Sequence, residues 1–78
     1  MIIEIYTKDA CPYCIMAKEF LQEKNIPYTE LKLNIDFPRE AVLAKFEPHK
    51  TFPFIVVDNV FVGGYTDFIA HMKGLGYE

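Results

Sequence analysis

The hydrophobic and polar positions of this chain change their period several times, and each change predicts a new element. An Ile-rich run over residues 1–6 is typical of a mostly buried strand. Over residues 12–24 the apolar positions follow a helical period instead. The positions that share one face of this helix are Cys14, Ala17 and Leu21. The start of the chain therefore predicts a strand followed by an amphipathic helix.

The pattern then alternates over residues 28–35, which predicts a half-buried strand. The apolar positions on its buried side are Leu31, Leu33 and Ile35. A second helix is expected to follow, with Asp36 as its cap and Pro38 in its first turn. It must end before Pro48, because proline cannot continue a helix.

Two apolar runs, residues 54–57 and 60–62, are separated by Asp58 and Asn59, a pair that tolerates the positive φ angles of a two-residue hairpin. Two glycines then precede a last short helix over residues 66–73. A strand, helix, strand unit gives two parallel strands through a right-handed crossover. We therefore expect an α/β fold: a four-stranded mixed sheet (βαβ-α-ββ-α) flanked by three helices.

Composition narrows the class of protein. The 78 residues suit a single domain over residues 1–78, and a hydrophobic fraction of 51% is enough for a core. A formal net charge of −3 argues against a nucleic-acid partner, which would need a basic surface. The first apolar run is interrupted by Glu4 and is too short for a signal peptide or a membrane span. We expect a cytoplasmic monomer that binds no membrane.

The two cysteines, Cys11 and Cys14, carry the candidate chemistry. A disulfide that closes so small a loop would restrict the unfolded chain little, so a structural role is the weaker interpretation. A zinc site would need two more ligands, and His49 and His71 do not have the spacing for it, so we expect no metal. A C-x-x-C pair between a predicted strand and helix instead indicates thioredoxin-like redox chemistry.

The two thiols should have different roles. Cys11 lies where a helix begins, and a helix N-terminus lowers the pKa of a thiol and favours the reactive thiolate. The amides of Tyr13 and Cys14 can donate to its sulfur, Pro12 has no N–H to donate, and Lys8 adds a nearby positive charge. We expect Cys11 to be an exposed nucleophile and Cys14, on the buried helix face, to be the resolving thiol.

Three motifs in order now indicate a family. Residues 11–14 (C-P-Y-C), preceded by I-Y-T-K at 5–8, are followed by T-F-P at 51–53 and G-G-Y-T-D at 63–67. This set resembles the small dithiol glutaredoxins over nearly the whole chain. The resemblance implies a thioredoxin-like fold and reduction of glutathione mixed disulfides and protein disulfides, with ribonucleotide reductase a possible protein partner. Glutathione would be the cosubstrate, with no metal or organic cofactor.

The same resemblance implies a glutathione site. The residues assigned to it are Lys8, Tyr13, Lys50, Thr51, Phe52, Pro53, Gly64, Thr66 and Asp67. Pro53 would follow a cis peptide bond. Thr66 and Asp67 would hold the γ-glutamyl end of glutathione, and Lys8 and Lys50 would bind its glycine carboxylate. Arg39 is a weaker candidate for that carboxylate.

Some positions depart from the family pattern or have no role in it. Tyr65 stands where the family often has cysteine or another small residue. No motif includes His49 or His71, which we expect to be surface or packing residues.

Two other functions stay open from the sequence. One is a glutaredoxin-like redoxin that takes electrons from thioredoxin reductase and gives them to ribonucleotide reductase; the G-G-Y-T-D segment and Lys8 argue against it. The other is a dimeric module that holds an iron–sulfur cluster through Cys11 and glutathione. Pro12 argues against the cluster, because cluster-binding relatives usually have glycine there.

Overall fold

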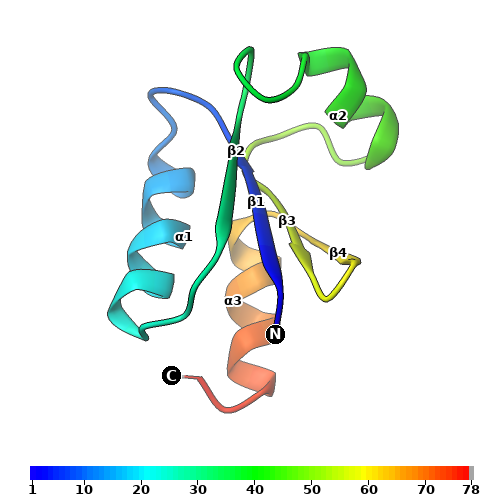
Figure 1. Ribbon diagram of the computed structural model, residues 1–78. Coiled ribbons are helices and arrows are strands. Elements are labelled where there is room, and N and C mark those ends of the chain that lie inside the picture. Colours follow the sequence, from blue (N-terminus) through cyan, green and yellow to red (C-terminus); the bar gives the residue numbers. More distant parts are fainter. Residues whose placement is uncertain (78) are drawn as a thin grey trace.

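The computed structural model describes residues 1–77, which form one four-stranded sheet and three helices (Figure 1). The elements are β1 (Ile3–Thr7), α1 (Pro12–Glu23), β2 (Thr29–Lys32), α2 (Arg39–Lys45), β3 (Phe54–Val57), β4 (Val60–Gly63) and α3 (Tyr65–Gly74). The strand order is β2-β1-β3-β4. β1 pairs with β2 in parallel and with β3 antiparallel, and β3 and β4 form a hairpin. The predicted mixed sheet is confirmed.

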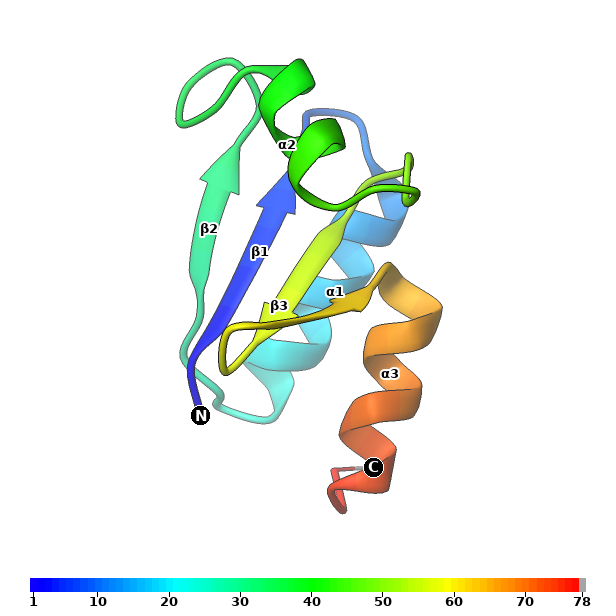
Figure 2. The same cartoon turned by 90° about the vertical axis from the view of Figure 1, so that its right-hand side faces the viewer.

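The sheet separates two apolar cores. Helices α1 and α3 cover one face, and α2 lies across the other face beside the end of β1 (Figure 2). Under α1 and α3 the buried side chains are Ile3, Ile5, Ala17, Leu21, Ile55, Val57, Phe68 and Met72. The second cluster, between α2, the sheet and the start of α1, comprises Tyr6, Cys11, Cys14, Val42, Phe46, Phe52, Phe54 and Val56. The alternating side chains of β1 and β3 serve both cores, because successive residues of a strand point to opposite faces.

Helix α1 forms as its period predicts. Pro12 is its first residue, where the missing N–H costs no intrahelical hydrogen bond. Cys14, Ala17 and Leu21 are all buried, as expected. The helix begins immediately after the loop that follows β1, so its N-terminus is held at the end of the central sheet.

The strand expected over residues 28–35 ends earlier, at Lys32, and its pattern was misleading. The chain turns instead: the Asp36 carboxylate accepts a 2.7 Å hydrogen bond from the Lys32 N–H, and Asn34 has a φ of 65°. Ile35 lies on this turn and is 76% exposed, so its expected burial is wrong. Because the Asp36 side chain closes the turn, it does not cap α2; Pro38 occupies that position.

The hairpin and the end of the chain follow the expected pattern. Asp58 and Asn59 have φ angles of 51° and 66°, as a two-residue turn of this kind requires. Gly63, with a φ of 118°, turns the chain from β4 toward α3. A Cβ atom there would collide with the side chain of Asp67. Within the described residues, no helix is long and apolar enough to cross a membrane.

Candidate functional site

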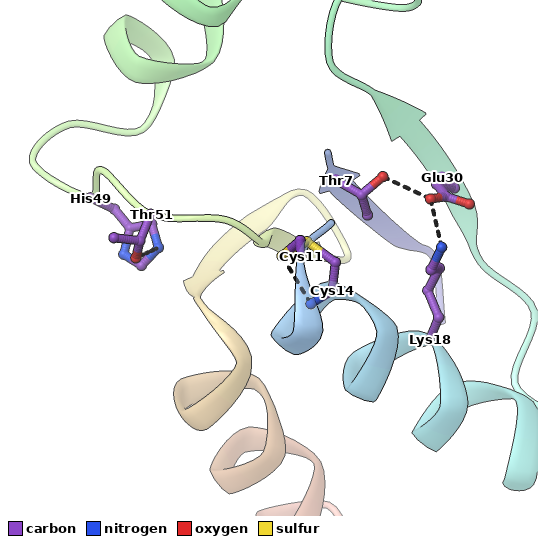
Figure 3. Close-up of a disulfide and its surroundings, with 7 residues drawn as sticks. All are labelled: Thr7, Cys11, Cys14, Lys18, Glu30, His49 and Thr51. Carbon is purple, nitrogen blue, oxygen red and sulfur yellow. Dashed lines mark hydrogen bonds and ion pairs between the residues drawn. A yellow bond between two sulfur atoms is a disulfide. The ribbon is translucent and has the colours of Figure 1, made fainter. Parts of the chain in front are cut away.

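The cysteine pair lies at the first turn of α1, immediately after the loop from β1 (Figure 3). Ala10 enters this turn in the left-handed region, with a φ of 55°. Cys11 is the N-cap residue, and its Sγ accepts a 3.1 Å hydrogen bond from the backbone N–H of Cys14. The two sulfurs are joined in a disulfide, with the Cα atoms 5.2 Å apart.

The two cysteines are less different in exposure than expected. Cys14 is buried on the inner face of α1, which confirms that expectation. Cys11 is only 5% exposed, so the expected exposure is wrong for the disulfide form. Its side chain belongs to the apolar cluster that includes Tyr6 and Phe52, and its sulfur is bonded to that of Cys14. A Cys11 thiolate would accept a hydrogen bond from the Cys14 N–H and would lie at the positive end of α1. Both interactions favour the charged form.

The T-F-P segment precedes β3 and lies beside the cysteine pair. The peptide bond between Phe52 and Pro53 is cis, as the family resemblance implies. A second cis bond joins Glu47 and Pro48, which the sequence pattern did not indicate. Phe52 packs edge-on against Phe54, with ring centroids 5.0 Å apart.

One pocket, the Cys11 pocket, has a volume of about 290 Å³ and is lined in part by Cys11. It is lined by Lys8, Ala10, Cys11, Pro12, Tyr13, Arg39, Lys50, Thr51 and Phe52. Lys8 Nζ lies 5.7 Å from the centre of the Phe52 ring, and Arg39 Cζ lies 6.0 Å from it, within the range of cation–π attraction. Three cations from three segments therefore surround the entrance to Cys11, which suits an anionic ligand.

A second pocket of about 290 Å³, the Asp67 pocket, adjoins the first. It is lined by Tyr13, His49, Thr51, Phe52, Pro53, Gly64, Tyr65, Thr66 and Asp67. Tyr13, Thr51 and Phe52 line both pockets. The rings of Tyr13 and Tyr65 lie 5.8 Å apart and form an aromatic wall between α1 and α3. The N-terminus of α3 lies at this pocket, and its N-cap residue, Gly64, has no side chain that could accept from the first amides.

All nine residues expected to bind glutathione line one or both of these pockets. Arg39, the weaker candidate, lines the Cys11 pocket with Lys8. Tyr65 lines the Asp67 pocket, where its ring packs against that of Tyr13. His49 also lines that pocket, which sequence reasoning missed. Its position just before T-F-P was the available signal, but a lone histidine with no spacing partner did not indicate a site.

A four-stranded mixed sheet with helices on both faces, and a C-x-x-C pair where the first helix begins, defines a thioredoxin-like dithiol protein. The glutaredoxin family model matches residues 3–62. The chain belongs to the glutaredoxin family.

Related sequences agree with this assignment. The chain is 44% identical over 64 residues to glutaredoxin 1 of Rickettsia felis, covering 80% of this chain and 63% of that protein. It is 35% identical over 68 residues to glutaredoxin 3 of Escherichia coli, covering 87% of this chain and 82% of that protein. The chain thus spans less than two thirds of the length of the rickettsial relative.

Solved structures support the thioredoxin-like fold. Glutaredoxin 1 from Francisella tularensis, complexed with cacodylate, superposes with a TM-score of 0.79 at 27% identity and covers 99% of this chain and 98% of its own. A buckwheat glutaredoxin–glutathione complex (TM-score 0.77, 20% identity; 92% of this chain, 69% of that one) shares the fold. The glutaredoxin-like NrdH-redoxin of Escherichia coli also shares the fold, with a TM-score of 0.73 at 17% identity over 92% of this chain and 93% of its own. Fold alone therefore does not separate a glutaredoxin from a redoxin.

Proposed function

We propose that this protein is a glutathione-dependent thiol–disulfide oxidoreductase that reduces glutathione mixed disulfides and protein disulfides through Cys11 and Cys14. One observation carries the proposal: two adjoining pockets meet beside Cys11, one with three cations and the other with Asp67 and an open helix N-terminus. A redoxin reduced by a protein reductase would have no use for both sets of charged groups.

The pockets match glutathione in chemistry and order. Its γ-glutamyl end carries an ammonium, which Asp67 would pair with, and an α-carboxylate, which would accept from the first amides of α3 near Thr66. Its central sulfur would reach Cys11. Its glycine carboxylate would lie among Lys8, Arg39 and Lys50 in the Cys11 pocket.

Backbone groups would align the peptide between these ends. Phe52, the residue before Pro53, lines both pockets. Its N–H and C=O would pair with the cysteine residue of glutathione in a short antiparallel ladder. Thr51 and Tyr13 line both pockets and would flank the bound peptide. Gly64 lines the Asp67 pocket as the N-cap of α3, where its backbone would face the γ-glutamyl end.

The reaction would begin when the Cys11 thiolate attacks the glutathione sulfur of a mixed disulfide. The bond between that sulfur and the target sulfur breaks, the target leaves as a thiolate, and a Cys11–glutathione disulfide forms. A second glutathione thiolate then attacks the glutathione sulfur of this disulfide. Glutathione disulfide is released and the Cys11 thiolate is regenerated. The target sulfur has been reduced to a thiolate, and the sulfur of the incoming glutathione has been oxidised to the disulfide level.

Protein disulfides would use both cysteines. Cys11 forms a mixed disulfide with the substrate, and the Cys14 thiolate attacks the Cys11 sulfur and releases the second substrate thiol. The product is the Cys11–Cys14 disulfide present in the structure, which glutathione would reduce. The dithiol carries both electrons, so no metal or organic cofactor is needed. Ribonucleotide reductase is a candidate substrate, and the reducing cytoplasm is the compartment that suits this cycle.

The test is turnover of a glutathionylated peptide, coupled to NADPH through glutathione and glutathione reductase, with thioredoxin reductase assayed in parallel. We expect activity in the glutathione system. Activity with thioredoxin reductase alone would contradict the glutathione site and favour a redoxin.

Cysteine variants separate the roles of the two thiols. Cys11→Ser should abolish turnover of both substrate types, because Cys11 is the N-cap residue and its thiolate begins both reactions. Cys14→Ser should keep reduction of the glutathionylated peptide within about threefold of the wild-type rate and lose reduction of a protein disulfide. Complete loss of peptide reduction in Cys14→Ser would contradict this division.

A further inference from the structure

His49 lies on the loop between α2 and β3, and its imidazole is held by three contacts. The ring packs edge-on against Phe54 and Phe61, with centroid distances of 4.9 Å and 5.5 Å. Its Nε2 lies 3.5 Å from Thr51 Oγ1, which belongs to the T-F-P segment (Figure 3). The side chain is half-buried. These contacts fix the orientation of the imidazole ring.

The ring also lies against the start of α3. A Cβ atom added to Gly64, the N-cap of that helix, would lie 3.2 Å from His49 Cε1 and 3.4 Å from Nε2. The missing side chain of Gly64 therefore lets the imidazole approach the helix N-terminus. The imidazole and the first amides of α3 line the same Asp67 pocket.

We propose that His49, in its protonated form, binds the α-carboxylate of the γ-glutamyl group of glutathione and strengthens glutathione binding as the pH falls. The inference rests on the proposed function, which places this carboxylate at the N-terminus of α3. The lining of the Asp67 pocket includes one carboxylate, Asp67, and His49 is the one lining side chain in the described chain that can become cationic near neutral pH. A cationic imidazole would give the ligand carboxylate a charged partner opposite Asp67, and the bound carboxylate would offset the repulsion between that cation and the positive end of α3.

The other ionisable groups around the ring are of types whose charge state does not ordinarily change near neutral pH. Within the pocket these are Asp67 from α3 and the hydroxyls of Tyr13 and Tyr65. The groove on the other side of His49, between α2 and the following loop, contributes Arg39, Glu40, Glu47 and Lys50. β3 and β4 present the rings of Phe54 and Phe61. Carboxylates, phenols, guanidinium and ammonium groups ordinarily change charge outside pH 6–8, whereas imidazole is the side-chain type that ordinarily changes charge within it.

The test compares the wild-type enzyme with His49→Phe and His49→Gln in the glutathione-coupled assay near pH 6 and near pH 8. His49→Phe keeps an aromatic ring against Phe54 and Phe61. We expect its KM for the glutathionylated peptide to exceed the wild-type value about fivefold near pH 6 and less than about twofold near pH 8. His49→Gln keeps a hydrogen-bond donor without a titratable charge, so its KM ratio to wild type should also fall as the pH rises. The effect should lie in KM and not in kcat.

Two controls make the result specific. His71→Gln, on the exposed side of α3, should leave the ratio of KM values at the two pH values unchanged. The rate at which neutral iodoacetamide alkylates Cys11 should match the wild-type rate in both His49 variants, because the nucleophile itself is unaltered. If the KM of the His49 variants relative to wild type is the same at the two pH values, the role of His49 is overturned while the proposed function stays intact. A wild-type protein without glutathione-dependent turnover would instead contradict the proposed function.

Discussion

At the scale of single residues, Glu30 shows how opposing effects set a pKa. Burial acts to raise the pKa of this β2 carboxyl. The hydrogen bonds from Thr7 Oγ1, at 2.7 Å, and Lys18 Nζ, at 2.9 Å, act in the other direction, as do the charges of Lys18 and Lys32. Together they outweigh burial, so the pKa of Glu30 lies below its ordinary value of 4.5. The carboxylate thereby joins β1, β2 and α1 (Figure 3).

This shift predicts a pH-dependent contribution to stability. Because the pKa of Glu30 is lower in the folded than in the unfolded protein, its contribution is present above the ordinary value and is lost as the pH falls through the folded value. Glu30→Gln should lower the free energy of unfolding by about 1 kcal/mol near neutral pH and much less near pH 3. Urea titrations at the two pH values measure this, with Glu23→Gln, at an exposed position of α1, as the matched control. Equal destabilisation by Glu30→Gln at both values would contradict the assignment.

At the scale of elements, the β3–β4 hairpin depends on its two-residue turn. Asp58 and Asn59 both have positive φ angles, which asparagine and aspartate tolerate better than most residues. The turn is also joined to the start of the chain: the Asp58 carboxylate accepts from the Ile2 N–H at 2.7 Å, and the Asp58 N–H donates to the Ile2 carbonyl at 2.8 Å. These bonds extend the antiparallel pairing of β1 with β3 into the turn.

Asn59→Val should therefore destabilise the protein, because a β-branched residue resists the φ of 66° at this position. We expect the free energy of unfolding to fall by about 1–2 kcal/mol in chemical denaturation. Asn59→Gly is the matched control and should not lose stability, since glycine adopts this conformation without a Cβ penalty. If Asn59→Val has the same free energy of unfolding as Asn59→Gly, the positive φ at this position does not determine the stability of the hairpin.

At the scale of the whole molecule, the charge around Cys11 opposes the net charge. The chain carries a formal net charge of −3, yet Lys8 after β1, Arg39 at the start of α2 and Lys50 on the following loop converge on the Cys11 pocket. No two of these cations belong to the same element, so the fold alone concentrates them. A local positive field in an acidic protein can steer an anion to this pocket.

Under the proposed function, this convergence predicts an ionic-strength dependence. The kcat/KM for the anionic glutathionylated peptide should fall as salt rises from about 20 mM to about 500 mM, because salt screens the steering field. Arg39→Gln and Lys50→Gln should each lower kcat/KM about threefold at low salt and make its salt dependence shallower. Lys73→Gln, in the last turn of α3, should do neither. A salt dependence unchanged in both pocket variants would assign the steering to other charges.

The features predictable from the sequence are those set by near neighbours along the chain. Cys14, Ala17 and Leu21 share a face because the helical period places them there, and Asp58 with Asn59 indicates a turn through its own backbone preferences. The same local rules failed at Ile35. Its alternation with Leu33 fits a strand, but the Asp36 carboxylate bonds to the Lys32 amide and turns the chain first.

The sequence by itself determined the order of the elements, the redox motif and the family resemblance, because periods, turn residues and motif spacing act over a few residues. Only the tertiary structure decided that Cys11 is covered, that Arg39 joins Lys8 at one pocket, and that His49 faces the start of α3. Burial and pocket composition depend on which distant segments pack together. The packing of distant segments is determined by the burial of apolar side chains from the whole chain, so it cannot be predicted from any short run of residues.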